Sequence, residues 1–109
     1  MKEIKAYIKK HKLTPVIRAL RKIDGLTGMS IIDSYGYGLG WGKAGGDAQM
    51  ESRPGVKLEI VCQQDLVDQV VAAIEEAAHT GLKGDGKIYV GSIEQAVRIS
   101  TGERGEGSV

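Results

Sequence analysis

Glycine and lysine concentrate in one short segment whose composition suits the binding of an anion. From residue 81 to residue 87 the chain reads Gly-Leu-Lys-Gly-Asp-Gly-Lys. Glycines allow successive backbone N–H groups to face one point and form an anion-binding concavity, and the two lysines add positive charge. An ordinary connection between a helix and a strand does not need so many glycines. We therefore predict that this segment binds phosphate groups.

The spacing of this segment also matches the start of the P-loop pattern, in which a glycine, four residues and Gly-Lys precede a serine or threonine. The next residue here is Ile88, which has no hydroxyl group for magnesium. The hydrophobic pattern also places a helix before the segment and a strand after it. A P-loop requires the reverse order, because the N-terminus of the following helix must face the phosphates. The P-loop interpretation is therefore rejected in favour of a phosphate-binding loop of another kind.

Hydrophobic periodicity predicts the elements that carry this segment. Alternating apolar residues indicate strands, and apolar residues at helical spacing indicate helices. Strands are expected at 4–9, 29–35, 56–61 and 87–90, helices at 14–24 and 65–78, and a short extended piece at 97–99. This order predicts one α+β domain over residues 1–109, with a ferredoxin-like βαββαβ topology, an antiparallel sheet and two helices on one face.

Capping signals predict where the helices begin. Thr14 followed by Pro15 predicts an N-cap and a first-turn proline, and Asp65 predicts the cap of the second long helix. Residues 92–95, Ser-Ile-Glu-Gln, have the pattern of a capping box and predict one further short helical turn.

Composition excludes several classes of protein. Fifteen basic and fourteen acidic residues nearly cancel, and we expect no concentrated basic stretch and no nucleic-acid partner. No apolar run is long enough to cross a membrane or to form a signal peptide. A single cysteine, Cys62, fits a reducing compartment. We therefore expect a cytoplasmic protein.

The residue types and their spacing give little support for a metal site or a catalytic nucleophile. Cys62, His11 and His79 lack the spacing of metal ligands, and we expect no metal site. No serine or cysteine lies in a recognisable nucleophile setting, and we expect no catalytic residues and no enzyme activity. The glycine-rich stretch 36–55 predicts a long loop of the kind that is usually functional or disordered, and its Trp41 fits either an interface anchor or a side chain that folds back.

Several ordered motifs of this sequence resemble those of the PII signal-transduction family. Residues 80–88, Thr-Gly-Leu-Lys-Gly-Asp-Gly-Lys-Ile, resemble its B-loop, and residues 97–105, Val-Arg-Ile-Ser-Thr-Gly-Glu-Arg-Gly, resemble its C-terminal signature. Residues 27–29 and 36–38 resemble the segments that lead into its T-loop, and residues 56–61 its return strand. The similarity extends from Lys2 to about Glu106.

This resemblance implies a homotrimer that binds ATP, ADP or AMP in the clefts between subunits and regulates a membrane transporter or metabolic enzyme, without an obligatory cofactor. Residues 39–53 would form the T-loop that binds the partner, through Trp41, Lys43 and Arg53. The residues implied to hold the nucleotide are Ser30, Gly36, Gly38, Glu59, Val61, Gly84, Asp85, Gly86, Lys87 and Arg98. Of these, Val61 would lie against the adenine, and Arg98 suits bidentate contact with a phosphate.

Departures from the family pattern imply an altered ligand preference. A second arginine usually follows Arg98 by two residues but is Ser100 here, and the lysine before the return strand is Gly55. The glutamine that helps to hold magnesium and 2-oxoglutarate is replaced around Leu39-Gly40. Each charged contact contributes about 1.5–3 kcal/mol, or one to two decades of affinity. We therefore expect little 2-oxoglutarate sensing, weak dependence on magnesium, and a preference for ADP or AMP.

The predicted loop departs in another way, because no tyrosine lies between Leu39 and Arg53. The usual uridylylation or adenylylation site of the family is therefore missing, which implies a divergent member. Two other functions remain open at this stage. One is an adaptor that responds to a metal or to bicarbonate on the same trimeric scaffold, and the other is a slow nucleotide-hydrolysing enzyme.

Overall fold

The computed structural model describes residues 1–37 and 53–109. The predicted site residues Gly38, Trp41 and Lys43 lie outside these ranges, as does most of the predicted loop 39–53. In chain order the described elements are β1 (Lys2–Lys9), η1 (Lys10–Lys12), α1 (Leu13–Leu20), β2 (Ser30–Gly36), β3 (Arg53–Cys62), η3 (Gln64–Leu66), α2 (Val67–Ala78), β4 (Gly86–Ser92) and η4 (Glu106–Ser108). The η elements are single 3₁₀ turns.

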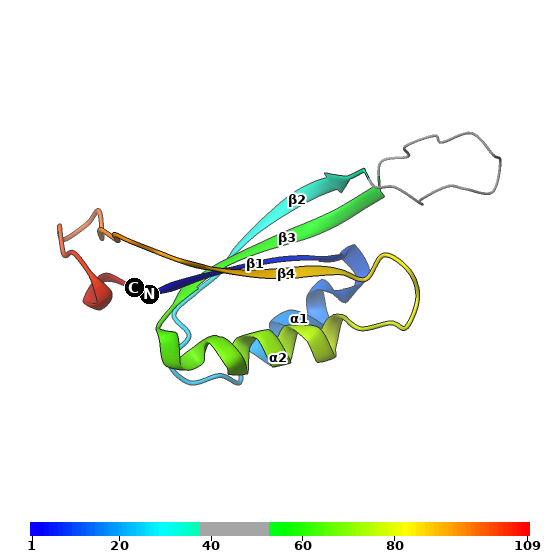
Figure 1. The fold of residues 1–109 in the computed structure, drawn as a ribbon, viewed down its shortest axis with the longest axis horizontal. Coiled ribbons are helices and arrows are strands. Elements are labelled where there is room, and N and C mark those ends of the chain that lie inside the picture. The colour runs from blue at the N-terminus through cyan, green and yellow to red at the C-terminus, as the bar shows by residue number, and fades with distance from the viewer. Residues whose placement is uncertain (38–52) are drawn as a thin grey trace.

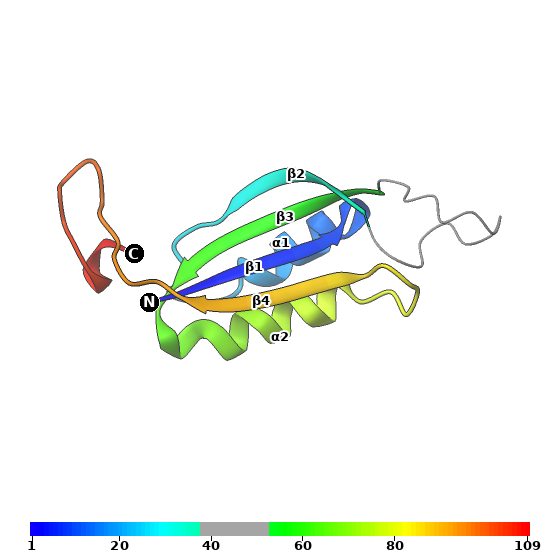
Figure 2. The same ribbon diagram turned by 45° about the horizontal axis from the view of Figure 1, so that its top comes forward.

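The strands form one antiparallel sheet in the order β2-β3-β1-β4. Both long helices cover the same face of the sheet, and α1 packs beside α2 (Figure 1, Figure 2). The other face of the sheet carries no element of the described chain. The predicted α+β, ferredoxin-like arrangement is therefore confirmed.

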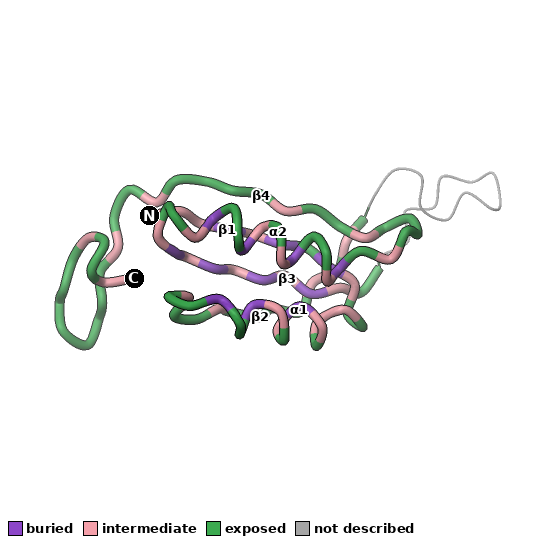
Figure 3. Tube along the Cα trace, turned by 90° about the horizontal axis from the view of Figure 1, so that it is seen from below, coloured by how far each residue is buried: buried purple, intermediate pink, exposed green. Residues whose placement is uncertain are grey.

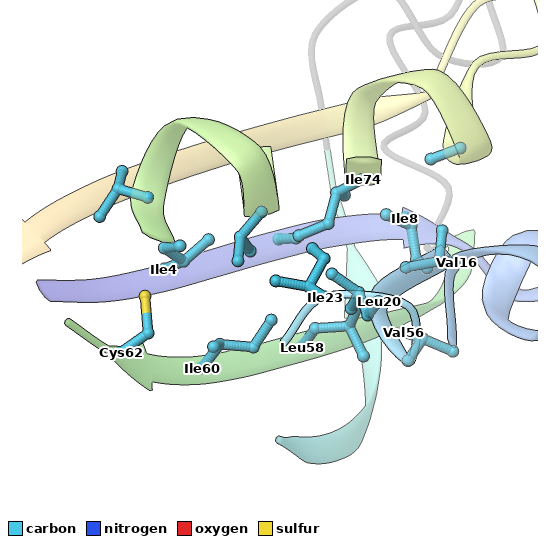
Figure 4. Packing of buried hydrophobic residues seen from close by; sticks show 14 residues of the cluster. Ile4, Ile8, Val16, Leu20, Ile23, Val56, Leu58, Ile60, Cys62 and Ile74 are labelled. Atoms are coloured by element: carbon cyan, nitrogen blue, oxygen red, sulfur yellow. The ribbon is translucent and has the colours of Figure 1, made fainter. Parts of the chain in front are cut away.

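Alternation along the two central strands determines what is buried. Every second residue of β1, from Ile4 to Ile8, and of β3, from Val56 to Cys62, faces the helices. Helix α1 contributes Val16 and Leu20 to the same layer (Figure 4). The core residues are Ile4, Ala6, Ile8, Val16, Leu20, Ile23, Val56, Leu58, Ile60, Cys62, Val67, Val70, Ile74 and Ala78. Burial of each large apolar side chain contributes about 1.5–3 kcal/mol, so this layer stabilises the sheet that carries the predicted site.

Polar and aromatic side chains occupy the open face of the sheet. The rings of Tyr7 and Tyr89 meet edge to face, with centroids 6.1 Å apart and planes at 81°. The ammonium of Lys57 lies 5.8 Å from the centre of the Tyr7 ring and 2.7 Å from a carboxylate oxygen of Glu59. Strand β4 and the C-terminal segment are mostly exposed (Figure 3).

The predicted helix starts are wrong in detail. Thr14 does not cap α1, because η1 begins the helical backbone earlier and α1 starts at Leu13. Asp65 lies within η3 for the same reason, and neither long helix has a side-chain hydrogen bond at its N-cap. The short turn predicted at 92–95 does not form. Ser92 is instead the last residue of β4, where its hydroxyl accepts a hydrogen bond of 2.9 Å from Lys2.

Every predicted strand differs from the observed one at one or both ends, by one to three residues. Strand β3 begins at Arg53 rather than at Val56, because Arg53 pairs with Gly36 and Pro54 with Tyr35. Arg53, predicted as part of the partner-binding loop, is therefore the first residue of a strand. The extended piece predicted at 97–99 forms only one isolated bridge, between Val97 and Arg104.

Candidate functional site

The loop between α2 and β4 is shaped from inside by the carboxylate of Asp85. One carboxylate oxygen accepts hydrogen bonds from the backbone N–H groups of Thr80, at 2.8 Å, and Gly81, at 3.3 Å. The Thr80 hydroxyl donates to the other oxygen and accepts a 3.1 Å bond from the N–H of Leu82. The Lys9 ammonium lies 3.1 Å from Asp85 and donates to the Thr80 hydroxyl at 3.2 Å. These contacts close the loop on itself and tie it to the end of β1.

The same contacts stabilise the negative charge of Asp85. The hydrogen bonds from the side chain and backbone of Thr80, followed by the contact with Lys9, hold the pKa of this carboxyl well below its usual range. Asp85 is therefore ionised, and its charge is compensated within the loop. Lys83 and Lys87 are exposed and make no ion pair within the described residues, so the outer side of the loop carries uncompensated positive charge.

Glycine is required where the loop enters β4. Gly81, Gly84 and Gly86 all have positive φ, at 80°, 82° and 106°, a region that residues with a side chain rarely adopt. At Gly86 an added Cβ would lie 1.6 Å from the carbonyl oxygen of Tyr7. The register pairs Gly86 with Ile8, which holds the loop exit against the central strand.

A second group of predicted residues lines an open cavity of about 340 Å³ at the other end of the sheet. Ser30 and Glu59 face each other across β2 and β3, and Val61 follows on β3. The hydrogen bond from Lys57 lowers the pKa of Glu59, and the same pair raises the pKa of Lys57. The cavity is lined by Glu3, Thr27, Gly28, Met29, Ser30, Glu59, Val61 and Val109.

Arg98 lies in the C-terminal segment, at the same end of the molecule as this cavity (Figure 1, Figure 2). Its backbone accepts a 2.8 Å hydrogen bond from the N–H of Gly102 and donates one of 2.8 Å to the carbonyl of Glu103, which forms a tight reversal. Its guanidinium lies 3.8 Å from Glu103 and 3.4 Å from the carbonyl of Ser108. The side chain is exposed, and within residues 1–37 and 53–109 it makes no ion pair or hydrogen bond with the predicted loop residues 84–87.

The predicted nucleotide residues that the structure describes therefore form two separate groups within one chain. Gly36 and the loop residues 84–87 lie at one end of the sheet, whereas Ser30, Glu59, Val61 and Arg98 lie toward the other (Figure 1). The register places Gly86 level with Val56 of β3, five residues before Val61. At 3.3 Å per residue this separation is about 17 Å along the strand.

The comparisons with known proteins agree with one another. A family model described as nitrogen regulatory protein P-II matches residues 1–103. The chain belongs to the P-II family. Relatives named nitrogen regulatory protein P-II align along nearly the full length. That of Bradyrhizobium diazoefficiens is 45% identical over 96% of both chains, that of Azospirillum brasilense is 41% identical over 96% of both, and that of Haemophilus influenzae is 43% identical over the whole of both.

As a P-II family member, the chain is a signalling protein of nitrogen regulation, and this class consists of regulators rather than enzymes. Within residues 1–37 and 53–109, no group of three or more His, Cys, Asp or Glu side chains could hold a metal ion. The helices of that part of the chain are too short or too polar to cross a membrane.

Sequence reasoning missed two residues of this P-II loop. Lys9 contacts the loop from β1, and no local pattern links it to a segment more than seventy positions away. In the sequence Thr80 is only the first residue of the B-loop-like motif, yet in the structure its hydroxyl connects Lys9, Asp85 and Leu82. A threonine five residues before an aspartate, across glycines, was the one available signal.

Proposed function

We propose that this P-II protein binds an adenine nucleotide in a cleft between two copies of the chain, and that the nucleotide controls what the segment between β2 and β3 contacts. The observation that carries the proposal is the separation of the predicted residues into two groups at opposite ends of the sheet. One chain alone cannot bring both groups to one nucleotide. A neighbouring chain supplies the second group.

If the loop end of one chain contacts the opposite end of the next chain, the contact is head-to-tail. Such contacts close into a ring when the rotation between chains allows it. Each chain then gives its loop end to one neighbour and its tail end to the other, so a ring has as many clefts as chains. The family resemblance sets the expected number at three. The open face of the sheet, with Tyr7 and Tyr89, is available for the ring interior.

In the proposed cleft the loop holds phosphate through its backbone and its outer charges. Gly84, Gly86 and Lys87 contact the phosphates, while Asp85 shapes the loop from inside and keeps its own charge compensated. Arg98 from the neighbouring chain adds a guanidinium group, whose five N–H donors suit bidentate contact with two phosphate oxygens. Gly36 borders the phosphates from the end of β2, and Ser30, Glu59 and Val61 hold the adenosine.

The chain lacks two cations that would favour a triphosphate. Gly55 and Ser100 occupy positions at which the family pattern usually has a lysine and an arginine. Each lost charged contact removes about one to two decades of affinity. ADP or AMP is therefore the preferred ligand, with weak dependence on magnesium and on 2-oxoglutarate. The regulated partner is a membrane transporter or a metabolic enzyme, which this protein contacts in the cytoplasm.

Calorimetry tests the ligand. We expect AMP, ADP or ATP to bind at micromolar concentration, near one site per chain, without an effect of 2-oxoglutarate. Lys87→Met and Arg98→Met should each weaken binding by one to two decades, whereas Lys22→Met, on the helical side, should not. Parallel titrations with bicarbonate and divalent metals cover the adaptor alternative. Absence of binding by every adenine nucleotide would refute the proposal.

Mixed assemblies test whether the cleft belongs to two chains. Lys87→Met and Arg98→Met chains are unfolded together and refolded as a mixture. If the two residues meet across a contact, about a quarter of the clefts receive both native residues and regain native affinity. If both residues served a cleft within one chain, no cleft in the mixture would recover.

The proposed switch has a built-in reporter, because Trp41 is the only tryptophan in the sequence and lies within the predicted loop. A ligand shifts a loop only by its different affinity for the two loop states. We expect the emission of Trp41 and its quenching by acrylamide to differ between the ADP, ATP and ligand-free states. Calorimetric binding with unchanged fluorescence would keep the nucleotide site and reject the switch.

A further inference from the structure

Charges are segregated within the helical layer, which corrects the expectation that no stretch of the chain concentrates basic residues. Residues 10–22 contain five lysines and arginines and no acidic residue, and residues 65–79 contain four acidic residues and no lysine or arginine. The basic strip consists of Lys10, Lys12, Arg18, Arg21 and Lys22. The acidic strip consists of Asp65, Asp68, Glu75 and Glu76. The two strips lie on α1 and α2 and on the turns that precede or follow them.

These charges face solvent and are not compensated by one another. All nine side chains are exposed except Lys12, which is half-buried. Within residues 1–37 and 53–109 none of the nine forms an ion pair, although α1 packs directly beside α2. The outer surface of the helical layer therefore has a positive half and a negative half.

The two strips run antiparallel, and contacts at each end fix how they align. At one end, Lys9, just before η1, reaches Thr80, just after α2. At the other end, Gly25, shortly after α1, lies beside Leu66 at the start of α2. Because α1 and α2 lie side by side (Figure 1, Figure 3), these two contacts place the start of the basic strip level with the Glu75 end of the acidic strip, and its end level with the Asp65 end.

We propose that this helical layer docks on the helical layer of a second copy of the chain. A two-fold axis parallel to the helices, lying between the layers, places each basic strip over the acidic strip of the partner. Both ends then match: Arg18 and Arg21 lie over the Asp65 end, and Lys10 over the Glu75 end. A two-fold contact requires a surface that is complementary to itself, and the segregated charges meet this requirement.

The charge pattern also selects this occupant over others. A uniformly anionic surface, such as a lipid membrane, attracts the basic strip but repels the acidic strip beside it. A two-fold axis perpendicular to the helices would place like charges together, so the pattern selects one orientation as well. The contact uses the helical side of the sheet and leaves the open side free for the proposed ring. It does not depend on nucleotide binding.

Sedimentation velocity of the full-length protein at two salt concentrations tests the docking. Electrostatic contacts between exposed charges act over about 30 Å at 0.01 M salt and about 3 Å at 1 M. We expect a species of twice the basal mass at low salt, which disappears at high salt while the basal assembly persists. Equal mass at both salt concentrations, over a wide range of protein concentration, would overturn the proposal.

Charge reversal supplies the sharper test. Arg18→Glu with Arg21→Glu, and Glu75→Lys with Glu76→Lys, should each weaken association at least tenfold, because exposed pairs become repulsive. A mixture of the two variants should associate again, since reversed strips face each other. Thermal unfolding checks that each double variant still folds, as expected because the substituted side chains are exposed. Failure of the mixture to associate, or binding of the native protein to phosphatidylserine vesicles without self-association, would overturn the proposal.

Discussion

Replacement of Gly86 by alanine tests whether the loop between α2 and β4, which is proposed to bind phosphate, is fixed by backbone geometry. Gly86 has a φ of 106°, and an added Cβ would lie 1.6 Å from the carbonyl oxygen and 2.7 Å from the carbonyl carbon of Tyr7. Both atoms belong to the central strand β1, so no flexible side chain can move aside. Alanine therefore requires β4 to separate from β1 at the loop exit.

The cost can be worked from two contributions. A positive φ disfavours a residue with a Cβ by about 1–2 kcal/mol. Separation of the strand ends removes about two ladder hydrogen bonds, each of which contributes about 0.5–1.5 kcal/mol. The expected loss in the free energy of unfolding is therefore about 2–5 kcal/mol, a large part of the 5–15 kcal/mol typical of a domain. Displacement of the loop should also weaken nucleotide binding.

Urea unfolding followed by circular dichroism measures this loss. Gly91→Ala is a matched control in the same strand, because its φ is ordinary and an added Cβ would meet nothing within 4 Å. We expect the control to remain within about 0.5 kcal/mol of the native protein. A Gly86→Ala protein as stable as this control, with native nucleotide affinity, would refute the argument that the loop exit demands glycine.

Three further predictions follow from the described contacts. Asp85→Asn should destabilise the protein near pH 7, and the deficit in urea unfolding should shrink as the pH falls below about 4. The reason is that a depressed folded-state pKa gives its full stabilisation above the unfolded pKa and loses it as the pH falls toward the folded pKa; a deficit independent of pH would contradict this. Burial raises the pKa of the Cys62 thiol, so a disulfide reagent at pH 8 should react at least tenfold more slowly in the native protein than in urea; equal rates would refute it. Leu58→Ala, in the core, should cost about 2–5 kcal/mol in urea, whereas exposed Leu82→Ala should cost little; equal losses would place Leu58 outside the core.

Hydrophobic periodicity was sufficient to predict the fold but not its boundaries. The two central strands and the two helices were predicted because each has one buried face, which leaves a clear period in the sequence. The errors lie where that signal ends. Pro54 suggested a loop, yet the pairing of Arg53 with Gly36 extends β3 past it. Thr14 and Asp65 suggested caps, yet 3₁₀ turns begin the helical backbone before either residue can act as one.

The loop of the candidate site was predictable because its chemistry is local, whereas its support was not. The glycines and lysines of residues 81–87 lie close together in the sequence, so a short window is enough to predict an anion-binding loop. Lys9 reaches the same loop only after β1 and β4 have paired, which no short window of sequence records. The division of the site between two ends of the sheet also follows from strand register and not from any motif.

The presence of Asp85 in a loop proposed to hold phosphate raises an electrostatic question, since a carboxylate repels an anion. The contacts answer it. Thr80 and Lys9 direct their donors to Asp85, so its charge is used to close the loop and is compensated from the inside. Lys83 and Lys87 stay on the outside without an ion pair in the described chain. The affinity of the loop for an anion should therefore depend on Lys9 and Thr80, although neither needs to touch the ligand. Removal of Lys9 would leave Asp85 stabilised only by Thr80 and Gly81 and would lower the summed charge of Lys9, Lys83, Lys87 and Asp85 from +2 to +1, so the attraction for an anion should weaken.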